Sequence, residues 1–158
     1  MDADRKKRLL TIIRNPAWVC FTWFGMTAGV SLLATPARFS AETITRAIAL
    51  DVGRVVFAAL NKAELVALII LLLIVRASPA ARKLWYFAAV LALILILQGE
   101  WLLPELAART DQIIAGIEPA PSIAHAAYSV LELTKLGILV VLGFRALSLL
   151  TDGQRDTN

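Results

Sequence analysis

Residues 52–75 have the sequence VGRVVFAALNKAELVALIILLLIV. An α-helix rises about 1.5 Å per residue, so this run reaches about 36 Å and can cross the roughly 30 Å hydrocarbon core of a bilayer. Three further apolar runs are long enough to do the same, at residues 17–34, 84–103 and 123–150. The sequence therefore predicts an all-α fold, in which residues 1–158 form one integral membrane domain built as a four-helix transmembrane bundle.

The composition of the whole chain also indicates a membrane protein. Hydrophobic residues make up 59% of the 158 residues, whereas soluble domains contain about 45–50% apolar residues. The net charge of +4 would suit nucleic-acid binding, but most of the Lys and Arg residues flank the apolar runs, as they do in membrane proteins. We therefore expect no nucleic-acid partner. The expected partners are the lipid bilayer and either a second copy of the chain or another membrane protein.

The distribution of basic residues predicts the topology. Of the 16 Lys and Arg residues, ten lie in the segments at one end of the predicted bundle, three lie in the two opposite segments, and three lie in or beside the apolar runs. Cytoplasmic segments of membrane proteins carry the excess of Lys and Arg. The sequence thus predicts a multi-pass protein of the cell inner membrane with both termini in the cytoplasm.

Breaker and capping residues predict where the helices begin and end. The first run is expected to end by Thr35-Pro36, and the third is expected to end at Trp101 to Pro104. Ser40 is expected to begin the second helical stretch as its N-cap. Gly116 is expected to close a short helix after the third run. Residues 25–29, GMTAG, have the small-xxx-small spacing that allows helices to pack closely.

Charged and polar residues interrupt the apolar runs, and they are the candidate functional residues. A charge at bilayer depth costs at least a few kcal/mol unless it faces a partner, the bundle interior or water. In the fourth run such residues recur every three or four positions, which places them on one helix face. The polar-core or transport candidates are Arg54, Asn61, Lys62, Glu64, Glu100, His125, Tyr128, Glu132 and Lys135.

Opposite charges among these candidates suggest how they are neutralised. Glu132 and Lys135 are three residues apart and can bond within one helix. Across helices, one scheme pairs Lys62 with Glu132, Glu64 with Lys135, and Arg54 with Asp51 or Glu100. Three interpretations stay open: a structural network that fixes the register of the helices, a translocation path or substrate site, and an interface with a partner protein.

No known catalytic motif accompanies these charges. The sequence has no nucleotide-binding loop, metalloprotease motif, nucleophile elbow or Cys-pair motif. With one His and one Cys in the chain, we expect no metal site and no cofactor. The first hypothesis is a non-enzymatic accessory or small-solute-handling membrane protein. The alternatives are a proton- or ion-coupled small transporter that acts as an oligomer, and a membrane enzyme that uses Glu132 and His125.

Two stretches resemble the TMEM205-like family of four-helix membrane proteins, a family built around a domain of unknown function. Residues 35–39, TPARF, followed by residues 53–57, GRVVF, are similar to the segments that end the first span and open the second span of that family. Residues 104–109 and 125–129 are similar to its segments after the third span and at the start of the last one. The resemblance implies a four-helix fold without a defined activity. The family positions would be Pro36, Phe39, Gly53, Phe57, Arg109 and His125.

Overall fold

The computed structural model describes residues 13–155, with side chains described for residues 13–149. Within this part of the chain the structure is helical and contains no strand. Three of its helical stretches are long and apolar enough to cross a membrane, Ala17–Phe39, Arg46–Ala77 and Ala80–Ile114, which indicates a helical membrane protein. The elements in chain order are α2 (Ala17–Ala28), η1 (Gly29–Ala34), α3 (Thr35–Phe39), α4 (Arg46–Ala77), η2 (Ala80–Leu84), α5 (Trp85–Ile96), η3 (Leu97–Leu102), α6 (Leu103–Ile114) and α7 (Ala124–Arg155).

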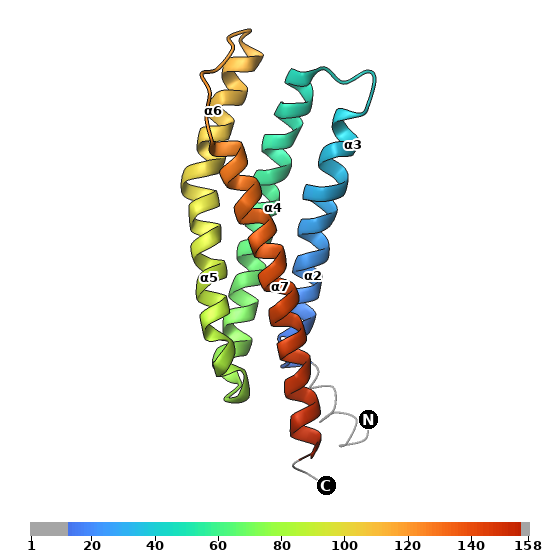
Figure 1. Ribbon diagram of the computed structural model, residues 1–158, viewed down its shortest axis with the longest axis vertical. Helices are drawn as coiled ribbons and strands as arrows, with labels where there is room; N and C mark the ends of the chain where they lie inside the picture. Colours follow the sequence, from blue (N-terminus) through green and yellow to red (C-terminus); the bar gives the residue numbers. More distant parts are fainter. Residues whose placement is uncertain (1–12, 156–158) are drawn as a thin grey trace.

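The long helices lie side by side along one axis (Figure 1). The start of α2, the turn between α4 and α5 and the end of α7 lie at one end, which we call the proximal end. The opposite, distal end contains α3, the start of α4 and α6. α7 packs against α2 and α5, and α4 packs against both α5 and α6, so residues far apart in the sequence meet between the helices.

The helix ends predicted at Pro36 and Pro104 are wrong, because both helices continue through their prolines. Each proline follows a π-helical turn, η1 before Pro36 and η3 before Pro104. At the end of η1 the backbone N–H of Thr35 donates to the carbonyl of Val30, five residues back. The wider π turn removes the hydrogen bond that proline cannot make and relieves the clash of its ring with the preceding turn.

The predicted start of the second helix at Ser40 is also wrong. Ser40 instead closes α3, with its hydroxyl donating to the carbonyl of Pro36 at 3.2 Å. α4 begins at Arg46, and its N-cap is Thr45, whose hydroxyl accepts from the backbone N–H of Ile48 at 3.4 Å. The helix then runs without interruption to Ala77. Ser and Thr are both favoured N-cap residues, and the structure uses Thr45 although serine ranks above threonine, so residue type alone does not locate the cap.

The helix end predicted at Gly116 is confirmed. Gly116 has a φ of +76°, a left-handed conformation that glycine adopts without steric cost. Its backbone N–H donates to the carbonyl of Ile113 at 3.1 Å, and the backbone N–H of Ile117 donates to the carbonyl of Gln112 at 2.9 Å. These two bonds form a Schellman motif, which satisfies carbonyls at the end of α6.

A compact apolar core fills the proximal half. Trp23, Leu71 and Leu139 are among its largest fully buried side chains. α2 approaches α7 closely at Gly143, where an added Cβ would lie 2.8 Å from Cζ of Phe21. Residues 25–29 do not make the close helix contact that their spacing predicts, since a Cβ on either of their glycines would meet nothing within 4 Å in the described chain.

Candidate functional site

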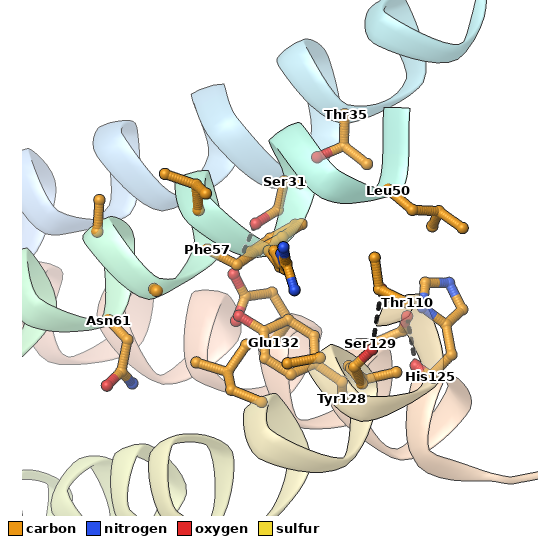
Figure 2. Close-up of a pocket in the computed structure, with 18 of the residues that line it drawn as sticks. Ser31, Thr35, Leu50, Phe57, Asn61, Thr110, His125, Tyr128, Ser129 and Glu132 are labelled. Atoms are coloured by element: carbon orange, nitrogen blue, oxygen red, sulfur yellow. Dashed lines mark hydrogen bonds between the residues drawn. The ribbon is translucent and has the colours of Figure 1, made fainter. Parts of the chain in front are cut away.

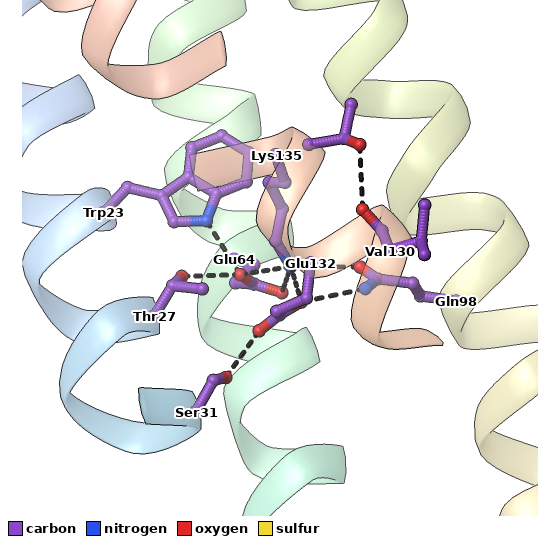
Figure 3. Close-up of polar contacts among 9 residues, drawn as sticks. Trp23, Thr27, Ser31, Glu64, Gln98, Val130, Glu132 and Lys135 are labelled. Carbon is purple, nitrogen blue, oxygen red and sulfur yellow. Dashed lines mark hydrogen bonds and ion pairs between the residues drawn. The ribbon is translucent and has the colours of Figure 1, made fainter. Parts of the chain in front are cut away.

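Acidic, basic and amide side chains from different helices meet in the interior of the bundle (Figure 3). Glu64 comes from α4, Gln98 from η3, and Glu132 and Lys135 from α7. α2 and η1 contribute further hydrogen-bonding side chains. We call the whole set the buried ion network, and its members are Trp23, Thr27, Ser31, Glu64, Gln98, Glu132 and Lys135.

Lys135 is the centre of this network. Its Nζ lies 2.6 Å from Oε1 of Glu64, 2.8 Å from Oε2 of Glu132 and 3.0 Å from Oε1 of Gln98. Lys135, Glu64 and Gln98 have 0% exposure and Glu132 has 3%. A buried ammonium without partners would be strongly destabilising, and here each of its three N–H groups can reach an oxygen.

The two carboxylates receive further donors from the first helix and from η3. Oε1 of Glu64 accepts from the indole Nε1 of Trp23 at 3.0 Å and from the hydroxyl of Thr27 at 2.7 Å. Oε1 of Glu132 bonds to the hydroxyl of Ser31 at 2.6 Å, and its Oε2 accepts from Nε2 of Gln98 at 2.8 Å. The network therefore ties four parts of the chain together at one depth.

The predicted pairing of Glu64 with Lys135 is confirmed, and so is the bond between Glu132 and Lys135 within α7. The predicted pairing of Lys62 with Glu132 is wrong, because Lys62 is exposed. Residues two apart on a helix point about 200° away from each other. When α4 turns Glu64 into the buried ion network, it turns Lys62 away from that network.

The third helix contributes Gln98, and not the predicted Glu100, to the interior. Glu100 is exposed and forms none of the ion pairs among the described residues. An amide is suited to this position because its oxygen can accept from Lys135 while its nitrogen donates to Glu132. A carboxylate could do only the first.

Sequence reasoning missed the hydrogen-bonding residues of the first helix. Trp23, Thr27 and Ser31 recur every four residues, so they lie on one face. Each has a polar group in an otherwise apolar run. This regular spacing was the signal that could have identified them.

A second group of candidates surrounds a cavity of about 1010 Å³ in the distal half, which we call the distal cavity. Its walls come from η1, α3, α4, η3, α6 and α7 (Figure 2). The volume lies at the upper end of the usual 300–1,000 Å³ range for ligand pockets. The predicted candidates that line it are Arg54, Asn61, Lys62, His125, Tyr128 and Glu132. Glu132 thus belongs both to the cavity wall and to the buried ion network.

Most of the cavity wall is apolar. Tyr128 is buried and packs edge-on against Phe57, with the ring centroids 5.4 Å apart. Small side chains such as those of Ala58 and Ala107 also face the space. The wall can therefore accommodate a hydrocarbon body.

Two polar groups at this wall have no partner among the described residues. Nε of Arg38 and Nδ2 of Asn61 are buried and make no hydrogen bond. Glycines allow both side chains to sit where they do, since a Cβ on Gly53 would lie 2.7 Å from Nη2 of Arg38, and one on Gly99 would lie 3.1 Å from Oδ1 of Asn61. A buried donor without an acceptor costs about 1–3 kcal/mol, so both groups favour an acceptor in the cavity.

Arg54 is already neutralised. Its Nε lies 2.7 Å from Oδ1 of Asp51, which confirms one of the two predicted pairings, and its Nη1 pairs with Asp111 of α6. The alternative pairing of Arg54 with Glu100 is wrong, because Asp111 takes that place. Arg38, by contrast, forms no ion pair with any described residue, although its guanidinium lies over the ring of Phe39 at 5.2 Å.

Comparisons of the chain with protein-family models, with curated proteins and with solved structures give no match. The resemblance to the TMEM205-like family therefore stays a prediction. Several of the residues that carry it nevertheless meet in space. Phe39, Gly53, Phe57 and His125 all line the distal cavity.

Proposed function

We propose that this chain is a non-enzymatic, small-solute-handling membrane protein that binds an amphipathic anion in the distal cavity. The observation that carries the proposal is the pair of unsatisfied donors, Nε of Arg38 and Nδ2 of Asn61, at the wall of a large and mainly apolar space. Pockets that combine apolar walls with a few convergent polar groups are the usual form of small-molecule sites.

The charges around the cavity support an anionic head group. Arg38, Lys62 and Arg54 line the wall, and Glu132 is the carboxylate among the lining residues. Arg54 is paired with two aspartates and Glu132 with Lys135. The positive charges of Arg38 and Lys62 have no such counter-charge in the described chain, so a negative head group is favoured over a positive one.

The proposal includes the membrane topology. We propose that α7 is a fourth span beside the three apolar helices. We also propose that the protein lies in the cell inner membrane and that both of its termini are in the cytoplasm. The excess of Lys and Arg in the sequence segments 1–16, 76–83 and 145–158 supports this orientation. Reporter fusions at the C-terminus and in the segment 115–123 test it, because the two reporters should lie on opposite sides of the membrane.

Binding can be tested with three probes that share one hydrocarbon chain and differ in head group: oleate, oleyl alcohol and oleylamine. Native mass spectrometry of the full chain, extracted gently and then exchanged into each probe, reports the bound fraction. We expect oleate to bind best and oleylamine least. The same spectra, recorded before exchange, show whether a membrane phospholipid, a smaller amphiphile or a partner protein remains bound.

Two matched variants locate the site. Ala107→Phe adds a ring to the cavity wall on α6, and Ala89→Phe adds the same ring to an exposed position of α5 away from the cavity. Oleate binding should be lost in the first variant and retained in the second. Equal binding by both variants, or equal binding of the three probes, would contradict the proposal.

A second candidate function is proton- or ion-coupled transport by an oligomer, because Glu132 connects the cavity to the buried ion network. Flux across proteoliposomes should then stop in Glu132→Gln while the protein stays folded. The third hypothesis, an enzyme that uses Glu132 with His125, is less well supported. The two residues are seven positions apart on α7, about 10.5 Å along its axis, which is too far for both to act on one atom.

A further inference from the structure

The charges in the buried ion network do not balance if every group is ionised. Glu64 and Glu132 supply two carboxylates and Lys135 supplies one ammonium, all within hydrogen-bond distance. All three groups are buried, with exposures of 0–3%. A net negative charge there is costly, and a single bound proton makes the network neutral.

The hydrogen bonds show which oxygen can take this proton. Oε1 of Glu64 faces the indole N–H of Trp23, the hydroxyl of Thr27 and the ammonium of Lys135. Its Oε2 also faces Lys135, at 2.8 Å. The hydroxyl of Thr27 could accept a proton from Oε1, but the indole and the ammonium are donors only. A proton on Oε1 of Glu64 would therefore compete with both of these donors, and a proton on Oε2 would point at the ammonium. Glu64 is therefore placed to remain ionised.

Glu132 differs at one of its two oxygens. Oε2 faces the donors Lys135 and Gln98, but the partner of Oε1 is the hydroxyl of Ser31 at 2.6 Å. A hydroxyl can reverse its role and accept. A proton on Oε1 would thus donate to Oγ of Ser31, and no other bond in the network would need to change.

Glu132 is also the member of the acid pair that lines the distal cavity, so water there can deliver and remove a proton. The charged and titratable groups around it are few. Glu64 and Lys62 lie on α4, and Lys135, Tyr128 and His125 on α7 itself, while η1 and η3 present the neutral Ser31 and Gln98. Arg38 on α3, Arg54 on α4 and Lys62 line the same cavity, but among the described residues only Lys135 forms an ion pair with Glu132.

We infer that Glu132 is a proton-binding site: it carries one proton on Oε1, donated to Ser31, while Glu64 and Lys135 stay ionised as a pair. Release of the proton to the cavity returns Glu132 to a carboxylate and returns the Ser31 hydroxyl to its role as donor. This inference rests on the ion network alone and holds whether or not the cavity binds an amphipathic anion.

Infrared difference spectroscopy of the full chain in lipid nanodiscs tests the inference, because a protonated carboxyl has a C=O stretching band that a carboxylate lacks. The wild-type protein near neutral pH should show one such band, which Glu132→Gln removes. Glu64→Gln should remove it as well, since one carboxylate then balances one ammonium. No solute is added, so failure of the oleate experiment does not affect this result.

A matched pair of variants distinguishes Glu132 from Glu64. Ser31→Ala deletes the hydroxyl beside Glu132, and Thr27→Val deletes the hydroxyl beside Glu64. The band should move to higher frequency in Ser31→Ala and stay unchanged in Thr27→Val. Both variants keep the charges and the ion pair, so they decide the assignment even if Glu132→Gln fails to fold. A wild-type protein without the band, or a band that moves only in Thr27→Val, would overturn the inference.

Discussion

The proximal and distal halves of the molecule are built from the same helices but packed in different ways. In the proximal half, large apolar side chains such as those of Leu71, Leu91 and Leu142 are fully buried and form one extended core. In the distal half a smaller apolar cluster, centred on Leu102 and Tyr128, borders a cavity of about 1010 Å³. The buried ion network lies between the two.

The difference follows from side-chain size. Where the distal helices face the cavity, the sequence supplies small residues, including Ala58 and Ala107. Close packing needs side chains that fill the space between helices, and these cannot. A bundle with one closed half and one open half can hold its shape at one end and bind at the other.

The largest effect is expected where the two halves meet. Lys135→Met removes the ammonium that contacts both Glu64 and Glu132, and breaking a buried ion pair in this way costs about 3–5 kcal/mol. The free energy of unfolding should fall by that amount, measured by SDS-induced loss of helicity in mixed micelles. Lys62→Met makes the same change at an exposed position of α4 and should alter stability by no more than about 0.5 kcal/mol. Similar losses in both variants would show that the network does not hold the bundle together.

The next effect compares the two halves directly. Leu71→Ala removes a side chain with 0% exposure from the closed half and should cost about 2–5 kcal/mol through lost packing and a new cavity. Leu106→Ala removes a half-buried side chain from the wall of the distal cavity. It should cost clearly less, because the space it leaves joins one that already exists. Equal losses in the same unfolding assay would contradict the difference in packing between the halves.

A smaller effect tests how closely α2 approaches α7 in the closed half. Gly143→Ala places a Cβ 2.8 Å from the ring of Phe21, and overpacking of this kind costs about 1–3 kcal/mol. Gly25→Ala on the same helix pair meets nothing within 4 Å and should be neutral or stabilise by up to about 1 kcal/mol, since alanine favours the helix. The thermal unfolding temperature should therefore fall in Gly143→Ala, and in Gly25→Ala it should rise or stay unchanged.

Much of the helical fold could be predicted from the sequence, because long apolar runs leave few other possibilities. The apolar runs located the helices, and Gly116 located the end of α6. The proline positions misled, since a π-helical turn ahead of Pro36 and Pro104 keeps each helix continuous. The rule that proline ends a helix does not include this adjustment, so it predicts a break where the helix continues.

The candidate site was predicted in part. Charge complementarity found Glu64 with Lys135, and helical periodicity found the face of α7 that carries Glu132. The choice of Gln98 over Glu100 could not be made, because the rotation of a helix that is apolar all round has no sequence signal. Arg38 was assigned to a segment outside the spans, and only the continuation of the helix past Pro36 brings it to the cavity.

The smallest effect is expected at the rim of the open half, where Arg54 bridges Asp51 and Asp111. The side chain of Asp111 is 64% exposed, and exposed ion pairs contribute little because water and salt screen them. Asp111→Asn should leave the unfolding midpoint within the error of the measurement at physiological salt, and any difference from wild type should shrink further as salt is added. The same salt series should not rescue Lys135→Met, whose charges lie out of reach of ions in solution. If salt changed the stability of both variants equally, ions in solution would reach the buried ion network. Lys135 would then belong to the open half of the bundle, and the boundary between the two halves would lie closer to the proximal end.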